Sequence, residues 1–149
     1  MFRIFLVVIF ISLFNIAFSQ TNPDFNLENT FNPNLTDQER KEIKDNIYNY
    51  SQILHQDPQN AVALINRGSM YAQLGLYPDA ITDYNSALRI DSTISQAYYN
   101  RGIAKARFRY TKPACLDIKK AAELGLDPAV DVYDNNCGLY KRELGEIKK

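Results

Sequence analysis

The sequence contains no tryptophan, a single histidine and only two cysteines in 149 residues. His55 has no cysteine at metal-ligand spacing, and the chain has neither a Gly-x-Ser-x-Gly motif nor a phosphate-binding glycine loop. An excess of charge of one sign is also lacking, because 17 basic residues balance 17 acidic ones. We therefore expect no metal, no cofactor and no catalytic residues, and the balanced charge argues against nucleic acid as a partner.

Long apolar runs are confined to the N-terminus. Arg3 precedes an apolar run over residues 4–14, and Ala17 and Ser19 supply the small residues that a signal peptidase reads. The run is shorter than the about 20 residues of a membrane span. We predict a signal peptide over residues 1–19 and an exported protein, periplasmic or secreted, that is not inserted in a membrane after cleavage. An uncleaved N-terminal anchor is the alternative.

A triplet repeats within the chain: Asn66-Arg67-Gly68 returns 34 residues later as Asn100-Arg101-Gly102. A repeat of this length is a supersecondary unit that buries its apolar face only by stacking on neighbours, which leaves an extended surface for binding. The same offset also matches Ala63 with Ala97, Ala72 with Ala106, Ala80 with Ala114, Asp83 with Asp117, and Ala87 with Ala121.

The spacing of apolar residues predicts helices from residue 36 onward. Thr36 and Glu39 form a capping box that opens the first helix. Gly75 and Gly125 provide left-handed helix ends, and a last helix opens at Asp127-Pro128. The expected helical ranges are 36–58, then 61–74 with 78–90, then 95–108 with 112–124, and finally the helix that opens at Asp127-Pro128.

These units resemble the tetratricopeptide repeat (TPR) family, of a short exported bacterial type. Gly68 and Gly102 stand where the two helices of the family's unit cross closely. Arg67 and Arg101 stand one position earlier, where the family usually has leucine. The resemblance implies an all-α fold of antiparallel helix hairpins, stacked as a short TPR solenoid with a C-terminal capping helix. The expected parts are a signal peptide (1–19), a flexible leader (20–35), a degenerate repeat helix (36–58), two repeats (61–94 and 95–128), and a capping helix with tail (129–149).

Cys115 and Cys137 are the only thiols. If the connection centred on residue 126 folds two helices antiparallel, each cysteine lies 11 residues from it, which sets the two side by side. An exported protein would also meet an oxidising compartment. We predict a Cys115–Cys137 disulfide, with two buried free thiols as the alternative.

The resemblance also implies a concave groove lined by the first helix of each unit. Asn66 and Asn100 match a position from which some family members hydrogen-bond a bound peptide. The expected function is a non-enzymatic protein–protein interaction module or scaffold of the cell envelope or secreted space, binding an extended peptide or partner protein. The alternative is a structural subunit that associates weakly with copies of itself through exposed repeat ends. The groove residues are Ile65, Asn66, Ser69, Gln73, Gln96, Tyr99, Asn100, Ile103 and Arg107.

The charged residues are interpreted mainly as solvent-exposed residues of the helices. We expect the carboxylates to lie on solvated helix faces. A basic cluster around the second repeat is interpreted as a solvated face or a site for an anionic protein partner. Its members are Arg101, Lys105, Arg107, Arg109 and Lys112.

Overall fold

The computed structural model describes residues 34–108 and 111–147, and within these ranges all regular structure is helical. The predicted signal peptide and almost all of the predicted leader lie outside the described residues. No helix in the described ranges has the length and apolar character that crossing a membrane requires. The helices are α2 (Asp37–Gln56), α3 (Ala61–Gln73), α4 (Tyr77–Ile90), α5 (Ser95–Phe108), α6 (Lys112–Glu123), α7 (Asp127–Asn136) and α8 (Gly138–Leu144).

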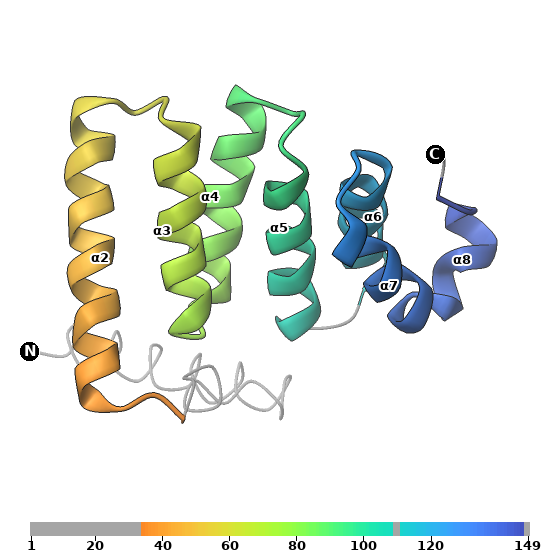
Figure 1. Ribbon diagram of the computed structural model, residues 1–149, viewed down its shortest axis with the longest axis horizontal. Coiled ribbons are helices and arrows are strands. Elements are labelled where there is room, and N and C mark those ends of the chain that lie inside the picture. Colours follow the sequence, from red (N-terminus) through yellow and green to blue (C-terminus); the bar gives the residue numbers. More distant parts are fainter. Residues whose placement is uncertain (1–33, 109–110, 148–149) are drawn as a thin grey trace, which may run out of the picture. The chain divides into compact units, whose positions relative to one another are not determined.

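The helices pack in chain order, as Figure 1 shows. α3 packs on α4 and α5 packs on α6, which gives two helix hairpins. α4 lies against α5, so the two hairpins stack directly on one another. α2 covers α3 from the N-terminal side and α7 covers α6 from the C-terminal side. The prediction of an all-α stack of helix hairpins is confirmed.

The helix ends follow the sequence signals. The Thr36 hydroxyl accepts from the Glu39 backbone N–H, and the Glu39 carboxylate accepts from the Thr36 backbone N–H at 2.7 Å. The hydrogen bonds from Thr36 lower the pKa of Glu39 below its ordinary value. α3 and α6 each end before a left-handed glycine, Gly75 with φ 80° and Gly125 with φ 88°. Positive φ favours glycine, which explains why a glycine follows each of these two helices.

Two glycines inside helices let the hairpins close. Gly68 of α3 faces the buried ring of Tyr84, and a Cβ at Gly68 would lie 2.8 Å from that ring. Gly102 of α5 faces Ile118 in the same way, with a Cβ 2.7 Å from Cγ1 of Ile118. Tyr84 and Ile118 are almost fully buried, so each large side chain fills the space that its glycine leaves open.

Gly102→Ala is expected to lower the free energy of unfolding by about 1–3 kcal/mol, because the added methyl group overpacks the α5–α6 crossing. Besides Ile118, the methyl group would lie 3.1 Å from the backbone oxygen of Ala114. Urea unfolding measures the loss. Gly138→Ala is the matched control, since a Cβ at Gly138 meets nothing within 4 Å. Equal stability of the two variants would contradict the close crossing.

The C-terminal region differs from the single capping helix that the sequence predicts. The helix breaks at Cys137, so α7 and the seven-residue α8 follow in its place. Asn136 precedes the break and Gly138 follows it, and both residue types have low helix propensity. In addition, Cys137 is held to α6 by a disulfide with Cys115, with a Cα–Cα distance of 5.7 Å. The predicted disulfide is confirmed, and both of its cysteines are fully buried.

Two hydrogen bonds hold the C-terminal end of α8 and the residue after it. The Tyr133 hydroxyl donates to the backbone oxygen of Gly145 at 2.8 Å. The Lys119 ammonium donates to the backbone oxygen of Leu144 at 2.6 Å. Together with the disulfide, these contacts fix α7 and α8 against α6, so the C-terminal region covers the last repeat with two short helices.

Candidate functional site

The nine predicted groove residues lie on α3 and α5, the first helices of the two hairpins. We call them the α3–α5 face: Ile65, Asn66, Ser69, Gln73, Gln96, Tyr99, Asn100, Ile103 and Arg107. The two helices meet here, because the Asn100 side-chain amide donates to the Ser69 hydroxyl at 3.3 Å. Gln73, Gln96 and Arg107 are exposed, and the other six side chains are partly buried. All nine therefore reach the surface while resting on the hairpins beneath.

Asn100 belongs to a short polar chain. Its oxygen accepts a hydrogen bond of 2.7 Å from the Gln96 amide. Its nitrogen donates to Ser69, whose hydroxyl donates to the backbone oxygen of Ile65 at 2.9 Å. Ser69 also lies 3.2 Å from the hydroxyl oxygen of Tyr84, a residue of α4 that is only 1% exposed. Burial raises the pKa of Tyr84, so the phenol stays protonated at neutral pH.

Asn66 and Arg107 differ from Asn100. Neither side chain has a hydrogen-bond or ion-pair partner among residues 34–108 and 111–147. Asn66 stands one repeat before Asn100, yet its amide is left to solvent. The α3–α5 face therefore offers one anchored amide, one unanchored amide and one exposed guanidinium.

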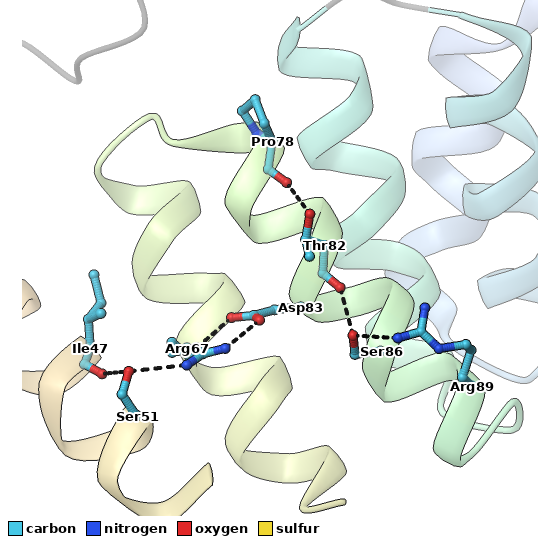
Figure 2. A network of polar contacts seen from close by, with 8 residues as sticks. All are labelled: Ile47, Ser51, Arg67, Pro78, Thr82, Asp83, Ser86 and Arg89. Carbon is cyan, nitrogen blue, oxygen red and sulfur yellow. Dashed lines mark hydrogen bonds and ion pairs between the residues drawn. The ribbon is translucent and has the colours of Figure 1, made fainter. Parts of the chain in front are cut away.

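A second polar network, beside the α3–α5 face, joins three successive helices (Figure 2). Arg67 of α3 donates to both carboxylate oxygens of Asp83 in α4, each at 2.8 Å. The same guanidinium donates to the Ser51 hydroxyl of α2 at 3.1 Å. The Asp83 side chain is 6% exposed, and its hydrogen bonds raise the pKa of Arg67 above the ordinary value. The guanidinium is therefore a permanent cation that ties the hairpin to the preceding helix.

The network recurs in the second hairpin. Arg101 donates to both carboxylate oxygens of Asp117, at 2.8 and 2.6 Å. It also donates to the Asn85 side-chain oxygen of α4 at 2.7 Å. Lys105 adds a third hydrogen bond to Asp117, at 2.7 Å. In the second repeat, the buried carboxylate of Asp117 therefore pairs with two cations, Arg101 and Lys105.

These networks correct the interpretation of the charged residues. Asp83 and Asp117 are buried rather than solvated, because each lies at the crossing of two helices where an arginine meets it. Arg67 and Arg101 are not mere departures from a leucine position, since each binds a carboxylate and a neutral acceptor. The 34-residue match of both arginine and aspartate is the sequence signal that points to these pairs.

The basic cluster around the second repeat is also largely used inside the fold. Arg101 and Lys105 pair with Asp117, and Lys112 of α6 pairs with Glu143 of α8. Arg109 lies outside the described residues. Arg107 is the member that remains exposed without a partner in the described part of the chain, so an open basic face does not form from the other described members.

Metal chemistry finds no support in the described ranges. No group of three or more His, Cys, Asp and Glu side chains there could hold a metal ion. His55 lies exposed in the last turn of α2. The α3–α5 face consists of amides, hydroxyls, apolar side chains and one guanidinium.

A stack of helix hairpins with such a face is a helical-repeat scaffold. Residues 68–107 match the model of the TPR repeat family. The chain is also similar to a solved structure, the first TPR of Spaghetti (RPAP3) bound to the HSP90 peptide SRMEEVD. That similarity has a TM-score of 0.61 and 26% sequence identity, and it covers 64% of this chain and 78% of the other.

Three curated proteins are also similar to this chain. RNA polymerase II-associated protein 3 of Xenopus tropicalis is 32% identical over 100 residues, which cover 67% of this chain and 14% of that protein. Protein SGT1 homolog of Oryza sativa subsp. japonica is 32% identical over 76 residues, 51% of this chain and 20% of that protein. The Hsp70-Hsp90 organizing protein of Triticum aestivum is 24% identical over 88 residues, 53% of this chain and 15% of that protein. The chain thus spans a small part of these relatives.

The comparisons support the TPR family for this chain, and with it a protein-interaction module. They also correct two predictions. The prediction of an exported protein, periplasmic or secreted, is contradicted, because the relatives are eukaryotic proteins of the cytosol and nucleus. An exported bacterial type is not supported for the same reason. Both predictions depended on the apolar run over residues 4–14, which lies outside the described residues and carries no information on the repeats.

Proposed function

We propose that the chain is a non-enzymatic scaffold that binds an extended peptide segment of a partner protein on the α3–α5 face. The observation that carries the proposal is the anchored amide of Asn100, which is hydrogen-bonded to Ser69 of the preceding repeat. An asparagine amide both donates and accepts, so it matches a peptide group. Tyr99 and Ile103 flank Asn100 on α5 and offer apolar contact area for the side chains of the ligand.

The proposed groove consists of all nine residues of the α3–α5 face, within repeats over residues 61–94 and 95–128. Adjacent helices in such a stack lie about 8–10 Å apart. An extended chain advances about 3.3 Å per residue. A peptide that crosses from α5 to α3 would therefore place peptide groups about three residues apart against Asn100 and Asn66.

The ligand that we propose carries little charge. The peptide SRMEEVD in the similar structure has three acidic side chains. The α3–α5 face of this chain holds one cation, Arg107, so it lacks the charge to balance such a peptide. We infer an extended segment with apolar side chains and at most one carboxylate near Arg107, rather than a strongly acidic one.

A selection from a displayed library of random peptides, each about 12 residues long, tests this function. The full chain is expected to enrich peptides, and the triple variant Asn66→Ala, Asn100→Ala, Arg107→Ala is expected to bind them at least about tenfold more weakly, because each lost hydrogen bond is worth about 1 kcal/mol. Fluorescence anisotropy with the enriched peptides measures the affinity. Circular dichroism checks that the variant keeps its helices.

The matched control removes two amides and one cation elsewhere. Asn49, Gln52 and Lys120 lie on α2 and α6, away from the α3–α5 face, so their triple alanine variant should bind the peptides as tightly as the unmodified chain. Equal binding by the groove variant would place the site on another face. Failure to enrich any peptide, together with a dimer in size-exclusion chromatography, would favour the alternative of a self-associating subunit.

A further inference from the structure

The Ser69 hydroxyl has its hydrogen-bonding capacity fully used. A hydroxyl has one proton to donate and two lone pairs to accept with. The backbone oxygen of Ile65 can only accept, so the Ser69 proton points to it at 2.9 Å. The Asn100 nitrogen can only donate, so it occupies one lone pair of Ser69 at 3.3 Å. The remaining contact, 3.2 Å from Tyr84, must then be a hydrogen bond that the Tyr84 phenol donates.

This arrangement fixes the orientation of Asn100. Because Ser69 has no proton left to donate, the side of Asn100 that faces it must be the nitrogen. The opposite side is then the oxygen, which accepts from Gln96 at 2.7 Å. One N–H of Asn100 and one lone pair of its oxygen remain free, and these are the two groups that a peptide unit needs.

We propose that Ser69 and Tyr84 are positioning residues that hold the Asn100 amide in one orientation, with its free N–H and its free lone pair presented to the backbone of a bound peptide. The inference rests on the proposed function of the α3–α5 face. It gives the Tyr84 hydroxyl a task separate from that of its ring, which packs against Gly68. An amide that is already oriented loses less conformational entropy on binding, so its orientation strengthens the complex.

Asn66 provides the comparison within the same protein. It occupies the equivalent position one repeat earlier but has no partner in the described part of the chain to hold its amide. Residue 35, which stands 34 before Ser69, is Leu35, so the polar chain that anchors Asn100 has no copy beneath Asn66. The two amides are therefore predicted to differ in mobility as well as in their share of the binding energy.

Relaxation of the side-chain amide groups in the full chain tests the positioning without any ligand. The Asn100 NH₂ group is expected to be rigid, and the Asn66 group is expected to have an order parameter below about 0.6, the range of flexible groups. Ser69→Ala and Tyr84→Phe should make Asn100 more mobile and leave Asn66 unchanged. Tyr77→Phe is the control, because it removes a hydroxyl from the same helix, α4, that has no hydrogen-bond partner among the described residues.

Binding of the peptides selected from the library provides the second readout. Tyr84→Phe is expected to weaken binding about five- to tenfold, since it removes one hydrogen bond from the chain that holds Asn100. Tyr77→Phe should leave the affinity unchanged. A thermal midpoint of the Tyr84→Phe variant close to that of the unmodified chain shows that the substituted ring still packs against Gly68.

The outcomes separate this inference from the proposed function. An Asn100 amide as mobile as Asn66, or one that both Ser69→Ala and Tyr84→Phe leave rigid, overturns the positioning. A rigid Asn100 that loosens in both variants supports it, whether or not a peptide has been found. The Asn100→Ala variant is then compared with the unmodified chain. If it binds the selected peptides as tightly, Ser69 and Tyr84 still orient the Asn100 amide, but the role of that amide in peptide binding is overturned.

Discussion

Asp117→Ala is expected to destabilise the protein by about 3–5 kcal/mol, the cost of leaving a buried charge without its partner. The Asp117 side chain is 8% exposed and balances two cations, Arg101 and Lys105. Asn85 gives Arg101 a neutral acceptor but does not replace the lost negative charge. Urea unfolding followed by circular dichroism measures the effect, with the midpoint and the slope reported separately.

Two further variants test whether the unpaired buried charge causes this loss of stability. Asp45→Ala removes the carboxylate of an exposed pair with Lys41, so it should leave the stability nearly unchanged. The triple variant Arg101→Met, Lys105→Met, Asp117→Leu removes the whole charged group and should recover most of the loss, because no buried charge then lacks a partner. A cost below about 1 kcal/mol for Asp117→Ala, against the few kcal/mol of a buried pair, would show that solvent replaces the carboxylate freely.

Reduction of the Cys115–Cys137 disulfide is expected to cost about 3 kcal/mol, because the bond closes a loop with a sequence separation of 22 residues. For a domain of this size the loss corresponds to roughly 10–20 °C in Tm. The first amides to lose protection from hydrogen exchange should be those of α7 and α8. Both helices depend on Cys137, and α8 has no buried residue of its own.

The double variant Cys115→Ala, Cys137→Ala is the control for the reductant. Alanine is preferred to serine, since both positions are fully buried and a hydroxyl there would need a hydrogen-bond partner. The double variant should unfold at the Tm of the reduced protein and should not respond to dithiothreitol. An unchanged Tm for protein shown by mass to be fully reduced would mean that the C-terminal helices are held by packing alone.

The repeat, the hairpins and the disulfide could be predicted from the sequence because each has a local signature. The capping box at Thr36, the glycines after α3 and α6 and the matched alanines all act over a few residues or at a fixed offset. The sequence also placed Cys115 and Cys137 together by symmetry about a turn. These signals depend on helix geometry, which is the same in every repeat.

The features that the sequence did not reveal depend on contacts between helices. Arg67 and Asp83 lie 16 residues apart on different helices, so neither helix alone indicates that they meet. The spacing of apolar residues continues through Cys137 and so does not reveal the break there, where a disulfide also joins Cys137 to another helix. Asn66 and Asn100 occupy matching positions, but only Asn100 is anchored, because Ser69 lies in the repeat before it. Both asparagines have the same position within the TPR repeat, so that position could not distinguish the anchored amide from the unanchored one.

The hydrogen bonds of Arg67 and Arg101 affect how such a chain can gain repeats by gene duplication. Arg67 finds its carboxylate 16 residues ahead and its neutral acceptor 16 residues behind, and Arg101 does the same with Asp117 and Asn85. Each arginine therefore needs a residue from the preceding unit as well as one from its own. A copied segment of 34 codons, the spacing of the repeated triplet, that includes Asn85 through Asp117 carries Arg101 together with both of its partners. A copy shorter or longer by one codon would shift the acceptor to another face of its helix, so this bonding pattern favours growth by whole repeats.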